Sequence, residues 1–139
     1  YIGIAGIIAF NPDISAAAQP EAVLAFRQAI READGVLICT PEYAHGVPGA
    51  LKNALDWTVG SADFSGKPTA LITASTDGSF AHAALLEILR TIDAKNVNDH
   101  NLLIQFIKAK MDDGKKLNHQ PTIAAIELLM NSFGSTINN

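Results

Sequence analysis

Short apolar runs alternate with amphipathic segments along most of the chain. The runs at 36–39 and 67–74 are mainly apolar, which is typical of strands buried on both faces of a parallel sheet. In the segments between such runs, apolar residues recur at intervals of three and four, as at Val23, Phe26 and Ile30, which predicts amphipathic helices. Strands and helices that alternate in this way indicate βαβ units. We therefore expect an α/β fold with a mostly parallel sheet and helices on both faces.

The same pattern gives bounds for each predicted element. We expect strands at 1–10, 36–39, 67–74 and 102–106, and helices at 20–33, 48–59, 80–93 and 121–133. Prolines near the first turn of three of these helices fit the predicted starts, because proline lacks only an N–H that would be unpaired there. The run at 36–39 is expected to be a central strand of the sheet. Its last residue, Cys39, is expected to be an inert core residue.

Composition narrows the class of protein. The chain has 139 residues, 48% of them hydrophobic and 17% charged, which predicts a single globular domain over residues 1–139. A net charge of -4 argues against nucleic acid or an anionic membrane as a partner. No apolar run reaches the roughly 20 residues that span a bilayer. One cysteine cannot form an internal disulfide, so we expect a cytoplasmic protein.

Several well-known catalytic motifs are incomplete in this sequence. Lys67 follows a glycine, but Pro68 stands where a phosphate-binding loop needs Ser or Thr. Ser75 follows a predicted strand, but it lacks the flanking glycines of a hydrolase nucleophile. The four histidines are scattered singly, without metal-ligand spacing. We therefore expect no metal site.

Two unusual loops follow predicted strands. Residues 40–48 read TPEYAHGVP, and residues 75–79 read STDGS. Ligands of open parallel sheets bind at the carboxyl ends of the strands, so neighbouring loops of this kind would line one crevice. The two prolines of the first loop restrict its backbone, which holds its amides and Tyr43 in place for a planar ligand. Gly78 in the second loop allows a ring to approach the backbone closely.

The stretch at 40–57, TPEYAHGVPGALKNALDW, resembles the signature of the NADPH-dependent FMN reductase family. The segments NPDI, ADGVLICTPEY, GKPTALITAS and DDGKKLNH occur in the order found in that family, so the resemblance covers nearly the whole chain. Its members are flavodoxin-like flavoproteins that reduce flavin, quinones, azo dyes or chromate. The resemblance implies a three-layer sandwich, FMN and NAD(P)H as cofactors, a small-molecule electron acceptor, and a homodimer or homotetramer.

The resemblance also implies a set of cofactor-binding residues. The isoalloxazine ring of FMN would contact Pro41, Glu42, Tyr43, Ala44 and His45 from the first loop, and Ser75, Asp77 and Gly78 from the second. Ala44 and Gly46 stand where the family often has Asn and Ser, so binding by backbone amides survives but binding by those side chains does not. The N-terminal strand and phosphate loop of the family have no counterpart here, and we expect the sequence to be a fragment that lacks them.

The function implied by the resemblance is that of an FMN-dependent oxidoreductase. Hydride would pass from NAD(P)H to the flavin, and electrons would then pass to flavin, quinone or a similar small acceptor. The alternative is a flavodoxin-like FMN-binding or electron-carrier module without turnover. Because the flavin would perform the chemistry, the resemblance also implies no discrete catalytic side chain. Simpler interpretations stand beside the site assignments: Glu42 as a solvated or ion-paired carboxylate, Lys52 and Asp56 as an intrahelical ion pair, and Trp57 as a packing or subunit-interface residue.

Overall fold

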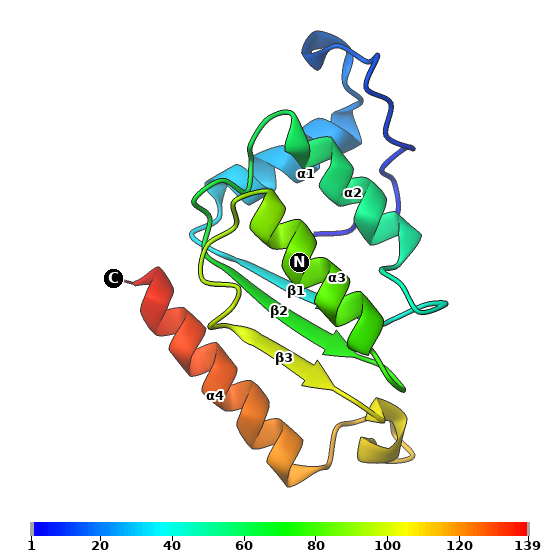
Figure 1. Ribbon diagram of the computed structural model, residues 1–139, viewed down its shortest axis with the longest axis vertical. Coiled ribbons are helices and arrows are strands. Elements are labelled where there is room, and N and C mark those ends of the chain that lie inside the picture. Colours follow the sequence, from blue (N-terminus) through cyan, green and yellow to red (C-terminus); the bar gives the residue numbers. More distant parts are fainter. Residues whose placement is uncertain (1, 139) are drawn as a thin grey trace.

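The computed structural model describes residues 2–138, which form a parallel sheet with helices on both faces (Figure 1). The strands are β1 (Val36–Thr40), β2 (Thr69–Ala74) and β3 (Asn101–Ile104), in the spatial order β1-β2-β3. The helices are α1 (Glu21–Glu32), α2 (Gly49–Val59), α3 (Ser79–Thr91) and α4 (Gln120–Ile137), with short 3-10 turns η1 (Ala16–Ala18) and η2 (Ile107–Lys110).

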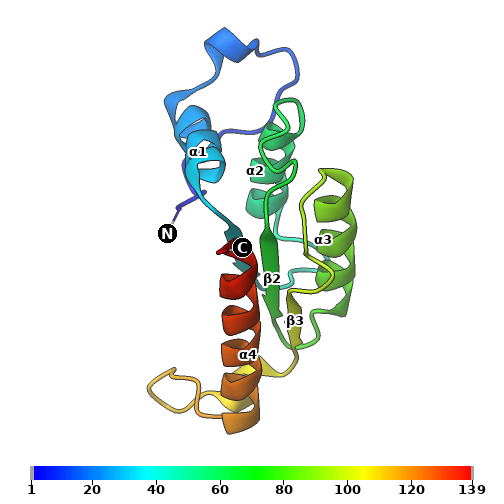
Figure 2. The same cartoon turned by 90° about the vertical axis from the view of Figure 1, so that its left-hand side faces the viewer.

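The central strand β2 contributes to a hydrophobic core on each face of the sheet. Leu71 packs with Ile38 of β1 and with apolar residues of α1, α2 and α3. The next residue, Ile72, packs with Ile104 of β3 and Leu129 of α4 on the opposite face, because successive strand side chains alternate between faces. Figure 2 shows α3 and α4 on opposite sides of the sheet. The expected three-layer arrangement is therefore confirmed.

β1 is an edge strand among residues 2–138, and the prediction of a central strand at 36–39 is wrong for this part of the chain. It pairs in parallel with β2, with Val36 opposite Thr69, and no strand lies along its other side. Leu37 and Cys39 are exposed, because α4 packs over β2 and β3. Cys39 is thus not a core residue. A short apolar run cannot by itself distinguish an edge strand from a central one.

The apolar run at residues 2–10 is not a strand, contrary to the prediction, and Tyr1 lies outside the described residues. The run is an irregular segment that is hydrogen-bonded to a side chain of α2. The Oδ1 atom of Asn53 accepts the N–H of Phe10 at 2.7 Å, and its Nδ2 donates to the carbonyl of Ile8 at 2.9 Å. The backbone of this segment is therefore satisfied by a helix side chain instead of a neighbouring strand.

The remaining predicted elements are confirmed to within a few residues. The largest difference at the C-terminal end is that α4 ends at Ile137, where the sequence predicted an end near Phe133. The predicted strand at 102–106 is β3, which ends at Ile104 because the chain then turns through Phe106 with a φ of 53°. No helix within residues 2–138 is long and apolar enough to cross a membrane.

Candidate functional site

The parallel sheet brings three loops together at the carboxyl ends of its strands. They are residues 41–48 after β1, 75–78 after β2 and 105–106 after β3. The carbonyl of Ile104 accepts the N–H of Ser75 at 3.1 Å, and the carbonyl of Thr76 accepts the N–H of Phe106 at 3.0 Å. The second and third loops are thus joined through their backbones. The expectation that the first two loops lie on neighbouring strands is confirmed.

The carboxylate of Glu42 joins the first loop to the second. Its Oε1 accepts the N–H of Gly78 at 3.2 Å, and its Oε2 accepts the N–H of Ala81 at 2.8 Å. These amides lie at the start of α3, whose N-cap residue has no side chain. A carboxylate there satisfies amides that the helix leaves unpaired and interacts favourably with the helix dipole. Glu42 is therefore a positioning residue and not a solvated or ion-paired carboxylate.

Gly78 is required by the packing of the fold. Its φ is 87°, in the left-handed region, and the residue is buried. A Cβ atom at this position would lie 2.9 Å from Cδ1 of Leu103 and 3.3 Å from Cγ2 of Thr73. Both features exclude larger residues, so the glycine lets the second loop close over β2 and β3 before it enters α3.

A tight turn forms the tip of the first loop. The N–H of Tyr43 donates to the carbonyl of Gly46 at 3.1 Å, and the N–H of Gly46 donates back at 2.9 Å. Between them, Ala44 and His45 have φ values of 49° and 54°, as in a type I′ turn. Their own N–H groups have no hydrogen-bond partner among residues 2–138. The turn therefore presents adjacent backbone donors, as the sequence predicted for a loop that binds through its amides.

Exposed aromatic rings lie on these loops and on the first turn of α3. Tyr43 is 67% exposed, and Phe80 and Phe106 are also exposed. The ring of His45 stacks on that of Phe80, with centroids 4.5 Å apart. Exposed apolar groups at one edge of a sheet indicate a surface that contacts a ligand or a partner. Sequence reasoning missed Phe80 and Phe106; the signal available was an aromatic residue within a few positions of the end of a predicted strand or of the loop that follows it.

The carboxylate of Asp77 joins the second loop to the first residue of α3 and to the third loop. Oδ1 accepts the N–H of Ser79 at 3.3 Å and the Nε2–H of Gln105 at 3.0 Å. Hydrogen bonds from the side chain and backbone of Ser79 lower the pKa of Asp77, with smaller contributions from Gln105 and His45. The group is therefore an ionised carboxylate at neutral pH and is unsuited to act as a proton donor.

The structure places every predicted site residue at this edge of the sheet. They are Pro41, Glu42, Tyr43, Ala44, His45, Ser75, Asp77 and Gly78. Lys52 and Asp56 of α2 form the expected intrahelical ion pair at 2.6 Å. Trp57 is buried and packs edge-on against Phe10, so its predicted packing role is confirmed.

Comparison with known proteins identifies the family of the chain. Residues 2–109 match the family model of NADPH-dependent FMN reductases, and this range contains all three loops of the site. The chain belongs to this family. Membership confirms the resemblance drawn from residues 40–57, and with it the reaction class of an oxidoreductase that uses FMN and NAD(P)H.

Similar proteins carry names of the same class. A 2-hydroxy-1,4-benzoquinone reductase of Burkholderia is 29% identical and aligns over 99% of this chain and 78% of its own length. An NADH-dependent flavin reductase subunit of Lactobacillus johnsonii is 38% identical over 91% of this chain and 75% of its own length. The solved flavoenzyme FerB of Paracoccus denitrificans, an NAD(P)H:acceptor oxidoreductase, superposes with a TM-score of 0.71 at 25% identity, over 99% of this chain and 76% of its own. The flavodoxin-like fold is thus confirmed.

The role of Glu42 can be tested by its removal. We expect Glu42→Ala to lower the free energy of unfolding by about 1 to 2 kcal/mol, because the amides of Gly78 and Ala81 lose their acceptor. The measurement is urea denaturation followed by circular dichroism. The matched control is Glu87→Ala in α3. The ion pair with Arg90 that it removes is exposed, so a change below about 0.5 kcal/mol in the free energy of unfolding is expected. Equal effects of the two substitutions would contradict the capping role.

Proposed function

We propose that the chain binds the ring system of FMN at the loops after β1 and β2 and passes electrons from NAD(P)H to quinone-type acceptors. The observation that carries this proposal is the turn at 43–46, which presents unpaired amides beside an exposed Tyr43. The hydrogen bonds that the Glu42 carboxylate accepts from the amides of Gly78 and Ala81 hold this loop in position. The site residues Pro41, Ser75, Asp77 and Gly78 belong to the same proposal through the loops they form.

The residues present fit a flat heteroaromatic ring. The edge of an isoalloxazine carries carbonyl oxygens and ring nitrogens, which accept hydrogen bonds from backbone amides. Besides the N–H groups of Ala44 and His45, those of Thr76 and Asp77 in the second loop have no partner among the described residues. Two loops therefore offer donors from neighbouring strands. Tyr43 adds an aromatic surface for stacking.

FMN, when bound, supplies hydride acceptance and onward electron transfer, chemistry that protein side chains lack. The residues of this chain position the ring and shape access to it. The carboxylate of Glu42 is engaged by amides of α3, and that of Asp77 is ionised and bonded to neighbouring groups. The ionised carboxylate of Asp77 is not suited to deliver a proton to a substrate at neutral pH, and both oxygens of Glu42 accept hydrogen bonds from backbone amides. We therefore propose no role as catalytic acid or base for either carboxylate.

Quinones are the acceptor class that the comparisons favour. Besides the Burkholderia protein, a Pseudomonas putida relative at 36% identity, aligned over 92% of this chain and 72% of its own length, is named a quinone reductase. A quinone ring is flat and apolar, and the exposed rings of Phe80 and Phe106 beside the loops offer surfaces of matching chemistry. An electron carrier without turnover is the alternative, which the family name disfavours.

We further propose a cytoplasmic homodimer or homotetramer. A single cysteine fits a reducing compartment. Several large apolar side chains are exposed on separate elements, among them Leu37 of β1, Val59 of α2 and Leu128 of α4. Burial of these side chains between copies of the chain would stabilise an assembly, because it removes apolar surface from water.

The proposed activity is tested with the purified protein loaded with FMN. We expect it to oxidise NADPH or NADH in the presence of 1,4-benzoquinone, and the oxidation to depend on FMN. Absorbance at the nicotinamide band measures the rate. Bound FMN without oxidation would assign the protein to the electron-carrier class. Failure to bind FMN at any concentration would overturn the proposal and its alternative together.

Tyr43 tests the position of the ring. We expect Tyr43→Ala to weaken FMN binding by about 1 to 2 kcal/mol, the order of magnitude of a lost stacking contact. Tyr43→Phe is the matched control and retains the aromatic face, so near-native affinity is expected. Quenching of flavin fluorescence during titration measures both. An unchanged affinity in Tyr43→Ala would show that the ring binds elsewhere on the loops.

A further inference from the structure

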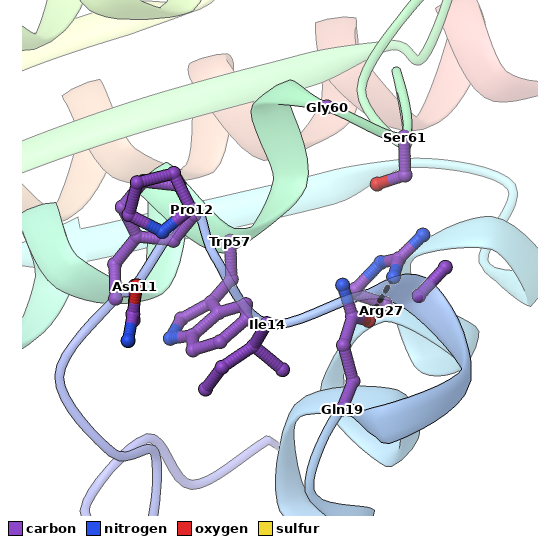
Figure 3. Close-up of a pocket in the computed structure, with 10 residues that line it drawn as sticks. Asn11, Pro12, Ile14, Gln19, Arg27, Trp57, Gly60 and Ser61 are labelled. Atoms are coloured by element: carbon purple, nitrogen blue, oxygen red, sulfur yellow. Dashed lines mark hydrogen bonds between the residues drawn. The ribbon is translucent and has the colours of Figure 1, made fainter.

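A cavity lies apart from the three loops, between the N-terminal segment, α1 and the C-terminal end of α2 (Figure 3). Its volume is about 330 Å³, and it is partly open to solvent. The lining combines apolar groups with a few polar side chains, principally Phe10, Ile14, Gln19, Arg27, Trp57 and Ser61. None of the predicted flavin-site residues lines it. Its size is at the low end for sites that bind small molecules, which suits a ligand of one ring.

Arg27 brings a largely buried cation to the wall of this cavity. Its Nε donates to the carboxylate of Asp63 at 2.8 Å, and its Nη1 donates to Oε1 of Gln19. The Asp63 side chain is fully buried and also accepts bonds from Arg31, at 2.8 Å, and from the hydroxyl of Ser61. The group thus holds two guanidinium ions against one carboxylate. One positive charge is left without a counter-ion inside the cluster.

The guanidinium of Arg27 retains a donor for a ligand. No hydrogen bond is made by its Nη2 within residues 2–138, whereas Nε and Nη1 are both engaged. Among the described residues, Nδ1 of His100 is the buried side-chain nitrogen or oxygen that lacks a hydrogen-bond partner. Nη2 of Arg27 also lacks a partner, so it is not one of the buried atoms and is open to solvent. Because Arg27 lines the cavity, this donor is available there. The amide nitrogen of Gln19 is a second free donor, since its oxygen is held by Arg27.

The guanidinium of Arg27 and the indole of Trp57 lie on different sides of the cavity. Figure 3 shows Arg27, Gln19 and Ser61 toward one side, and the indole of Trp57 with Pro12 toward the other. The ring of Phe10 meets that of Trp57 edge-on, with centroids 5.1 Å apart. An aromatic wall that faces a guanidinium matches a ligand with a ring at one end and an anion at the other.

We propose that this cavity binds a small aromatic monocarboxylate. The carboxylate would accept hydrogen bonds from Nη2 of Arg27 and the amide of Gln19, and the ring would lie against Trp57 and Phe10. Hydrogen bonds between a guanidinium and a carboxylate are stronger than neutral ones, so the charge of the ligand decides its affinity. The cavity lies at the opposite end of α2 from the loop at 41–48, and binding here does not depend on the proposed flavin site.

Trp57 provides the direct test, because it is the only tryptophan of the chain and its indole lines the cavity. The ¹⁵N-labelled protein is titrated with benzoate and, separately, with the neutral isostere benzamide, while the indole N–H resonance is followed by NMR. We expect a saturable shift with benzoate at an affinity at least about 10-fold above that for benzamide. No saturable shift up to about 10 mM benzoate, or equal affinity for the two compounds, would overturn the proposal.

Two substitutions distinguish the contribution of the Arg27 guanidinium from that of the nearby Arg31. Arg27→Lys keeps a cation beside Asp63 but loses Nη2, the nitrogen assigned to the ligand. We expect the affinity for benzoate to fall at least about 10-fold. Arg31→Lys is the matched control, because Arg31 bonds to the same carboxylate without lining the cavity, and native affinity is expected. Should Arg27→Lys not fold, Ala16→Phe in the cavity wall replaces it, with loss of benzoate binding expected. Native affinity in the folded variant would contradict the proposal.

Discussion

The hydrogen bonds from Gly78 and Ala81 to the Glu42 carboxylate set the geometry on which the candidate site depends. Parallel pairing of β1 with β2 places the two loops side by side, but it does not fix how they face each other. The Glu42 carboxylate fixes it, because it belongs to the first loop and accepts hydrogen bonds from the N-cap residue and the first turn of α3, which follows the second loop. A loop held in this way presents the same donors with or without a ligand, which lowers the ordering cost of binding.

Much of the fold follows from periodicity, and the rest depends on distant partners. The helices and the strands after residue 35 were predictable because their apolar spacing is local information. The segment at 2–10 was not, since its hydrogen bonds come from Asn53, more than 40 residues away in sequence. The exposure of Leu37 and Cys39 on β1 likewise depends on where α4 packs, and a short apolar run carries no information about that.

The candidate site shows the same division. The motif at 40–57 identified the loop and the family, and the structure confirms that the loop meets its neighbour. Its pattern did not reveal that Glu42 caps α3, because the acceptor and its donors lie 36 and 39 residues apart. Nor could it show that packing against Leu103 requires Gly78. A sequence motif thus indicates where a candidate site lies. The tertiary contacts show which of its residues hold the loops in position.

We propose that the loops at 41–48 and 75–78 already have the arrangement that binds FMN before FMN is present, and amide hydrogen exchange tests this proposal most directly. In the protein without FMN, the amides of Gly78 and Ala81 should already be protected by Glu42, whereas those of Ala44 and His45 should exchange fast. Addition of FMN should then slow exchange at Ala44 and His45 and leave Gly78 and Ala81 nearly unchanged. Fast exchange at Gly78 and Ala81 before FMN is added, or no effect of FMN at Ala44 and His45, would contradict the account.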